Sequence, residues 1–288
     1  METKFLELKK IRDFGEILNA TFIFLKQNVK PLFKALITYA GPFILLSAIA
    51  TGYYQSNALN TTLLTLNPGM NSLISYFEDI MLSLLLLIVA SSLSYTMIIT
   101  TVYSYMKLYV MHGKEGIVSE DLGRLIGKNF FRVFGTSIVI FLAIMIGMIF
   151  CFVPGIYLGV SLCLIFPIMI FEDISFSNAF SRSFKLTHYQ WWWTLLILIV
   201  IYLIVAVVGY IIAIPQMIIS FVYGFNSVAK SANPIEGIKD IMLVVTVFMT
   251  FINSLLGVIP FVTIALQYFN IVEKKENPAL LNRINQME

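Results

Sequence analysis

The sequence predicts an all-α integral membrane protein, a helical bundle of six transmembrane helices that form three hairpins with amphipathic helices at the cytoplasmic interface. Apolar residues make up 59% of the 288 residues and charged residues only 12%, whereas soluble domains contain about 45–50% apolar and about 25% charged residues. A soluble protein needs more polar surface than this, but a bilayer is itself an apolar solvent. Long apolar runs and an uneven distribution of Lys and Arg lead to the same fold class.

Six apolar runs are candidates for membrane spans. A helix needs about 20 apolar residues to cross the hydrocarbon core, and helices are expected because a backbone in lipid must satisfy its own hydrogen bonds. The predicted spans are residues 32–54, 80–111, 133–153, 156–171, 191–214 and 241–272. The second and sixth are 32 residues long, so we expect them to tilt, kink or project beyond the bilayer.

Proline and glycine mark the expected breaks between and within these spans. Val153-Pro154-Gly155 is typical of a turn and predicts a tight hairpin between the third and fourth spans. Pro260, just after Gly257, is the expected kink in the sixth span. Residues 211–225 are apolar but contain Pro215, and they fit a re-entrant segment, an interfacial helix or a seventh span.

The distribution of basic residues predicts the orientation. Of 19 Lys and Arg residues, all except Lys230 and Lys239 fall on one side of a six-span arrangement. The positive-inside rule makes that side cytoplasmic, with both termini and the tail 273–288 inside. A seventh span would move the basic residues of the tail outside, so the charge count argues against it.

Each hairpin is preceded by a segment with an apolar stripe and basic residues. Such helices usually lie in the interfacial plane, with the basic face toward lipid headgroups. The predicted interfacial helices are residues 12–30, 118–132 and 175–187. Asn28, Asn129 and His188 each follow an apolar residue by four positions and precede an aromatic residue by five. This indicates a loose threefold repeat; the alternative is that segments entering the interface share aromatic and basic composition.

The candidate binding residues lie on the second and third interfacial helices and at the end of the fourth span. Glu172 ends that span, and Arg182 or Lys185 is a suitable partner for its carboxylate. The basic faces suit lipid headgroups or a protein partner. The predicted set is Arg124, Lys128, Arg132, Glu172, Arg182 and Lys185.

The second span contains a line of hydroxyl groups. Ser92, Thr96 and Thr100 share one helix face and would suit a polar path through the membrane, as in a transporter. Small hydroxylated residues also allow close packing of helices in lipid. Packing is the favoured interpretation, and the same applies to Gly155-x-x-x-Gly159.

Catalytic and cofactor motifs are missing from the sequence. It has no Walker A motif, nucleophile elbow, H-E-x-x-H or dinucleotide fingerprint. Cys151 and Cys163 lie in apolar runs and are interpreted as packing residues. We therefore expect no enzymatic activity, no metal, no cofactor and no nucleic-acid partner.

The stretch from Val153 to Trp193 resembles the membrane domain found on some bacterial glycerophosphodiester phosphodiesterases. The shared elements are Pro154-Gly155-Ile156-Tyr157-Leu158, Phe166-Pro167, Glu172 and the run from Ala179 to Thr187. The segment Phe14-Gly15-Glu16-Ile17-Leu18 is similar to the opening of that domain. The resemblance implies the topology above and an association with lipids or envelope processes. It does not imply phosphodiesterase activity, which in the family resides in a separate soluble barrel.

These observations together predict a multi-pass protein of the bacterial cytoplasmic membrane. We expect it to be non-enzymatic and to engage membrane lipids, above all anionic ones, or an envelope protein or a second copy of itself, at the cytoplasmic interface. The alternative is a transporter or the membrane subunit of a transport complex.

Overall fold

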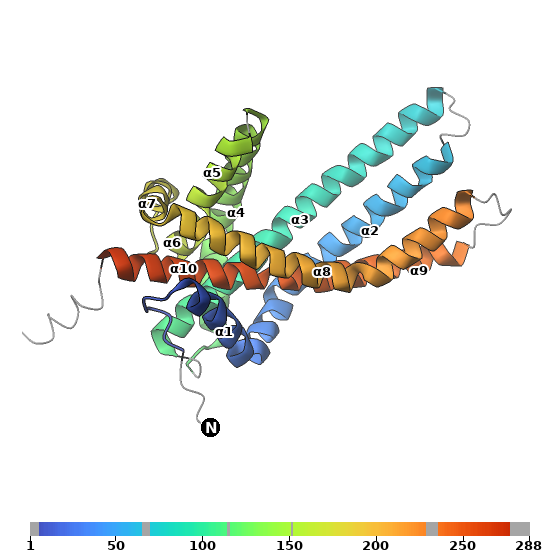
Figure 1. Cartoon of the computed structure of the whole chain (residues 1–288). Coiled ribbons are helices and arrows are strands. Elements are labelled where there is room, and N and C mark those ends of the chain that lie inside the picture. The colour runs from blue at the N-terminus through green and yellow to red at the C-terminus, as the bar shows by residue number, and fades with distance from the viewer. Residues whose placement is uncertain (1–5, 65–69, 114–115, 151, 229–235, 277–288) are drawn as a thin grey trace, which may run out of the picture. The chain divides into compact units, whose positions relative to one another are not determined.

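The computed structural model describes residues 6–64, 70–113, 116–150, 152–228 and 236–276. The chain is helical almost throughout these ranges, which contain no strand (Figure 1). The elements are α1 (Phe14–Ala35), η1 (Leu36–Ala40, a π-helix), α2 (Gly41–Leu64), α3 (Met70–His112), α4 (Ser119–Phe150), α5 (Phe152–Leu162), α6 (Ile165–Phe171), α7 (Phe176–Tyr189), α8 (Trp191–Val228), α9 (Glu236–Leu256) and α10 (Val258–Glu276). The predicted all-α class is confirmed.

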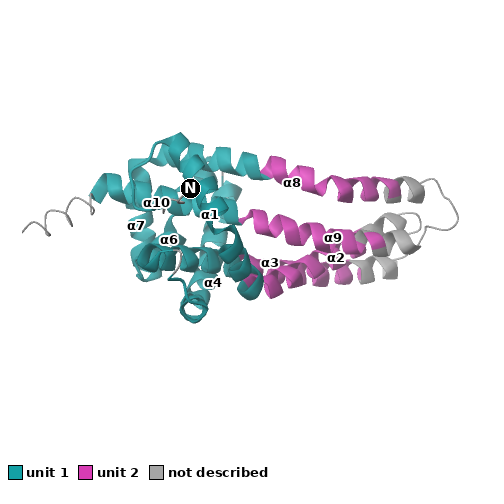
Figure 2. Cartoon of the chain, turned by 90° about the horizontal axis from the view of Figure 1, so that it is seen from below, with its two compact units in different colours: residues 1–39, 96–205, 258–288 teal, residues 40–95, 206–257 magenta. Residues whose placement is uncertain are grey.

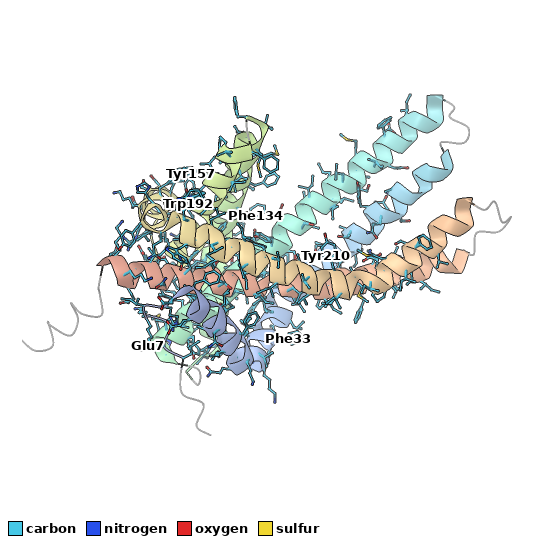
Figure 3. All side chains as sticks on the ribbon, in the orientation of Figure 1. Glu7, Phe33, Phe134, Tyr157, Trp192 and Tyr210 are labelled. Atoms are coloured by element: carbon cyan, nitrogen blue, oxygen red, sulfur yellow. The ribbon has the colours of Figure 1, made fainter. Side chains whose placement is uncertain are left out.

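Six helical segments of the described residues are long and apolar enough to cross a membrane, as the sequence predicts. They are Phe14–Ala58, Phe77–His112, Ser119–Phe150, Phe152–Phe171, Trp191–Val222 and Leu243–Glu276. Large apolar side chains remain exposed along them, including Trp192 and Tyr210, which Figure 3 labels. Such exposure suits side chains whose solvent is lipid.

At two predicted boundaries between an interfacial and a spanning segment, the helix continues without a break in the structure. α1 runs through η1 into α2, and α4 joins residues 118–132 to the apolar run that follows. The reason is local: no Gly-Pro pair separates the amphipathic stretch of α4 from its apolar stretch, so the helical hydrogen bonds continue. Placement of these amphipathic stretches in the membrane plane stays a prediction.

The turn predicted at Val153-Pro154-Gly155 is wrong in position. α4 ends at Phe150 and α5 begins at Phe152, so Pro154 lies in the first turn of α5, where a missing N–H is tolerated. α4 and α5 pack closely through glycine. A Cβ on Gly155 would lie 2.5 Å from the Sδ of Met148, which supports the packing interpretation at Gly155, whereas a Cβ on Gly159 would meet only Ile144 at 4.0 Å.

The last two predicted spans differ in whether their helices are interrupted. Gly257 separates α9 from α10 and donates its backbone N–H to the Ser254 carbonyl at 3.3 Å, so the helix is interrupted at Gly257, three residues before Pro260, and a kink there stays a prediction. By contrast, α8 continues through Pro215 to Val228. Residues 211–225 are therefore an extension of the fifth span, not a seventh span.

The chain forms two compact units, coloured in Figure 2. Unit 1 comprises residues 1–39, 96–205 and 258–288, and unit 2 comprises residues 40–95 and 206–257. In unit 1, Phe24 packs edge-on against Tyr109, with ring centroids 5.1 Å apart. In unit 2, α2 packs against α9, where a Cβ on Gly52 would be in ordinary contact with Val247 at 3.5 Å.

Candidate functional site

The candidate site lies in unit 1, where the chain turns from α6 into α7. α6 ends at Phe171, and the Glu172 N–H still bonds to the Ile168 carbonyl at 3.0 Å. Asp173 then adopts a positive φ of 54°, which is sterically unfavourable for most residues and less so for Asp. This residue ends the helix, and the two consecutive carboxylates reach different partners.

Asp173 is the centre of a cluster with two cations of α4. Its carboxylate accepts from the Lys128 ammonium at 2.5 Å and from the Arg132 guanidinium at 2.9 Å. Arg132 also donates to the Ile174 carbonyl at 2.5 Å. The bond from Lys128, assisted by Arg132, lowers the pKa of Asp173 below its ordinary value against the opposing effect of burial. The carboxylate is therefore ionised at neutral pH.

Glu172 belongs to a second cluster, which ties α7 to α10. The Arg182 guanidinium contacts Glu172 at 2.5 Å and donates to both carboxylate oxygens of Glu276 at 2.9 Å. Tyr268 donates its hydroxyl to Glu172 at 2.8 Å. Burial alone would lower the pKa of Arg182, but the bonds to Glu276 and Glu172 outweigh it and raise that pKa. The pairing of Glu172 with Arg182 expected from the sequence is confirmed.

A third polar group joins the N-terminal segment to α10. Arg12 is only 5% exposed, and its backbone N–H donates to the Asn270 side chain at 3.0 Å. Its guanidinium donates to the carbonyls of Glu7, Leu8 and Lys10. Asn270 in turn donates to Gln267 at 3.1 Å, and Gln267 to Thr194 at 3.0 Å.

Sequence reasoning missed this third group, although a signal existed. Gln267, Asn270 and Glu273 interrupt the apolar run of the sixth span at intervals of three, which places them along one side of a helix. Nothing in the sequence pairs them with Arg12, because the contact spans 258 residues.

The remaining predicted site residues, Arg124 and Lys185, lie outside these clusters. The Arg124 side chain is 81% exposed and lies 3.9 Å from Asp121. Lys185 contributes its backbone carbonyl, which accepts from Lys275 at 2.9 Å. The structure therefore brings Lys128 and Arg132 together, and Glu172 with Arg182. Within the described residues, no hydrogen bond or ion pair joins Arg124 or the Lys185 side chain to those pairs.

Two of the three hydroxyls of the predicted polar path donate hydrogen bonds to carbonyls of their own helix. Ser92 donates to the Ile88 carbonyl at 2.7 Å, and Thr100 donates to the Thr96 carbonyl at 2.7 Å. Thr96 is fully buried. Such back-bonding is the usual behaviour of hydroxyls inside helices. A polar path through these residues stays a prediction.

Two of the three junctions of the predicted repeat share a local hydrogen bond. Asn28 donates to the Phe24 carbonyl and Asn129 to the Leu125 carbonyl, each at 2.9 Å. Asn28 also accepts from the Tyr105 hydroxyl at 3.0 Å, which joins α1 to α3.

A cavity of about 470 Å³ opens beside the second cluster. Its walls come from the N-terminal segment, where Glu7 is labelled in Figure 3, and from α3, α6, α7 and α10. Glu172, Arg182 and Tyr268 line it together with Glu273, which is only 6% exposed. Within the described ranges, no group of three or more His, Cys, Asp or Glu side chains could hold a metal ion.

Comparison with protein families identifies a match over the second half of the chain. A family model described as the membrane domain of glycerophosphoryl diester phosphodiesterase matches residues 132–288, more than half of the chain. The match includes the turn from α6 to α7 and all of α10. Neither a search of curated proteins nor a search of solved structures finds a match.

Proposed function

The chain belongs to the family of the membrane domain of glycerophosphoryl diester phosphodiesterase, and from this membership we propose a non-enzymatic role in which it binds anionic, phosphate-bearing lipid headgroups. It is a multi-pass membrane protein by its family and its six apolar helices. The proposal concerns the ligand and the absence of a reaction, and it rests on the residues around Asp173.

The observation that carries the proposal is an excess of positive charge around Asp173. Lys128 and Arg132 pair with its carboxylate, and Lys107 is close enough to influence it electrostatically. These four groups carry a net charge of +2. The Lys128 side chain is 53% exposed, so an anionic surface has access to the cluster. Each basic residue near an anionic membrane surface contributes about 1 kcal/mol of attraction.

Contacts among distant segments support a cytoplasmic position for this cluster. The segments that the charge count places on one side are joined within unit 1, since Arg12 bonds to Asn270, Lys107 to Ile170, and Arg182 to Glu276. We propose that this is the cytoplasmic face of the bacterial inner membrane, whose inner leaflet is anionic. Both termini would then be cytoplasmic.

The test is lipid enrichment around the full chain. The protein is reconstituted in mixed phosphatidylglycerol and phosphatidylcholine, captured in nanodiscs, and the co-captured lipid is quantified. We expect phosphatidylglycerol to be enriched, and Lys128→Gln to reduce that enrichment by up to about fivefold, which corresponds to about 1 kcal/mol.

A charge-matched variant provides the control. Lys128→Gln with Asp173→Asn removes one positive and one negative charge, so the net charge of the cluster returns to that of the original chain. We expect this double variant to recover the enrichment. Equal capture of the two lipids by the original chain, or an enrichment that Lys128→Gln leaves unchanged, would contradict the proposal.

A further inference from the structure

The cavity beside the second cluster is lined by both apolar and charged side chains. Val110, Met111 and Val272 are among the apolar ones. The charged ones have both signs and include Lys9, Lys107 and Glu273. A cavity of about 470 Å³ with such a mixed lining suits an amphipathic ligand with a zwitterionic end.

Glu273 gives the first indication of the ligand. It is 94% buried, and its carboxylate makes no hydrogen bond or ion pair with any described residue. Arg182 lines the same cavity, but its guanidinium already bonds to Glu172 and Glu276. A carboxylate on a largely buried residue that lines a cavity loses part of its hydration without gaining a protein partner, which is energetically costly. A cationic hydrogen-bond donor in the cavity would remove that cost.

The lysines of the cavity give the second indication. Lys107 donates one N–H to the Ile170 carbonyl at 2.6 Å, and an ammonium group has three such donors. Lys9 is exposed at the rim. Two ammonium groups with donors to spare suit a phosphate. The cavity therefore offers partners for a phosphate and for an amine.

The aromatic residues of the cavity favour a primary over a quaternary amine. A quaternary ammonium is usually held by open aromatic faces. Here the Phe171 ring packs against Tyr268 and Phe269, with centroids 5.5 Å and 4.8 Å apart, so these faces are in contact with each other. A carboxylate instead accepts hydrogen bonds from a primary ammonium, which a choline group cannot donate.

We propose that this cavity binds the headgroup of a phospholipid that carries a primary amine, with the amine at Glu273 and the phosphate at Lys9 and Lys107. The apolar side chains of the lining then contact the start of the acyl chains, and Met111 among them is 62% exposed. This inference deepens the proposed lipid-binding function and rests on it, and it shares only Lys107 with the cluster around Asp173.

Native mass spectrometry of the full chain in mild detergent tests the proposal. Phosphatidylethanolamine, phosphatidylcholine and phosphatidylglycerol are added in turn, and the retained lipid is compared. We expect phosphatidylethanolamine to be retained about tenfold more than phosphatidylcholine, as for a charge-assisted hydrogen bond. Glu273→Gln should bring the two to within about twofold while leaving phosphatidylglycerol enrichment in nanodiscs unchanged.

Two further variants separate binding from folding. Glu120→Gln changes an exposed carboxylate at the start of α4, outside the cavity, and should keep the tenfold preference. Lys9→Gln changes an exposed cavity residue, so it should fold normally and weaken retention of both phospholipids, because both carry the phosphate. The lipid-free melting temperature of Glu273→Gln should not fall, since the variant removes an unpaired buried charge.

Three results would overturn the inference: equal retention of the two phospholipids, a preference that persists in Glu273→Gln, or displacement of bound lipid by free phosphoethanolamine at the same concentration. The last would assign the site to a soluble amine rather than to a lipid. A failure here can be told from a failure of the proposed function. Phosphatidylglycerol enrichment that responds to Lys128→Gln, without an amine preference, contradicts only this inference; the reverse result contradicts only the anionic-lipid proposal.

Discussion

Arg182 donates to both carboxylate oxygens of Glu276, at 2.9 Å each, across 94 residues of sequence. The pair fastens α7 to the last turn of α10, and Glu172 shares the same guanidinium. Paired donation of this kind depends on the planar fork of arginine, which a lysine ammonium cannot reproduce.

Replacement of Arg182 by Lys therefore tests the geometry of this pair. The positive charge stays, but the lysine ammonium cannot donate to three carboxylate oxygens of two residues in the way that the guanidinium does. We expect Arg182→Lys to lower the free energy of unfolding by about 1–3 kcal/mol, measured as a lower melting temperature in detergent. Lys185→Gln is the matched control on the same helix, because among the described residues Lys185 is hydrogen-bonded through its backbone carbonyl and not through its side chain. Equal stability of the two variants would contradict this role for Arg182.

Asp173 predicts a dependence of stability on pH. Its pKa in the folded protein is below the ordinary value of 3.8, so its pairing stabilises the fold at all pH values above that value. This stabilisation is lost as the pH falls below 3.8 toward the folded pKa. The side chain is 42% exposed, so we expect an effect of about 1 kcal/mol or less. Melting temperatures of the original chain and of Asp173→Asn, compared from pH 7 to pH 3, should converge at the acid end.

The contact between α4 and α5 predicts different tolerance at two nearby glycines. A Cβ on Gly155 would lie 2.5 Å from the Met148 Sδ and 3.0 Å from its backbone nitrogen, whereas a Cβ on Gly159 meets only Ile144 at 4.0 Å. Gly155→Ala should therefore destabilise the protein by about 1–3 kcal/mol through overpacking, and Gly159→Ala should be close to neutral. Thermal unfolding in one detergent compares them directly; a harmless Gly155→Ala would show that the two helices separate easily.

In unit 2, three polar side chains bond to one another within apolar helices. Gln216 donates to Gln55 at 3.3 Å and to Thr246 at 3.2 Å, and Thr246 donates to Gln55 at 2.9 Å. Hydrogen bonds between membrane helices contribute about 0.6–2 kcal/mol. We expect Gln216→Leu to lower stability by about that amount. Adding Gln55→Leu should cost less than a second independent loss, because one of the two partners of Gln55 is already gone and only Thr246 remains.

The sequence predicts the spans well because hydropathy and length act locally. The helix break at Gly257 and the pairing of Glu172 with Arg182 could also be predicted from the sequence, since each depends on residues close in sequence. The position of the turn after α4 could not be predicted in this way. Proline suits both a turn and the first turn of a helix, and Pro154 adopts the second role.

The arrangement of the site depends on contacts that no local pattern encodes. Asp173 meets Lys128 across 45 residues and Arg132 across 41, and its positive φ is a property of the folded turn. The same applies to the cavity at Glu273, whose walls come from both ends of the chain. Composition could indicate a basic interface, but it could not show that Lys128, Arg132 and Arg182 are paired with carboxylates.

The bond between the Arg12 backbone and Asn270 has a consequence for biogenesis. Asn270 is synthesised 258 residues after Arg12, when the preceding spans have already left the ribosome. The bond between Arg12 and Asn270 can therefore form only after α10 has been synthesised. Docking of the N-terminal segment is thus a step that follows the synthesis of α10, although this segment leaves the ribosome before all the helices described above.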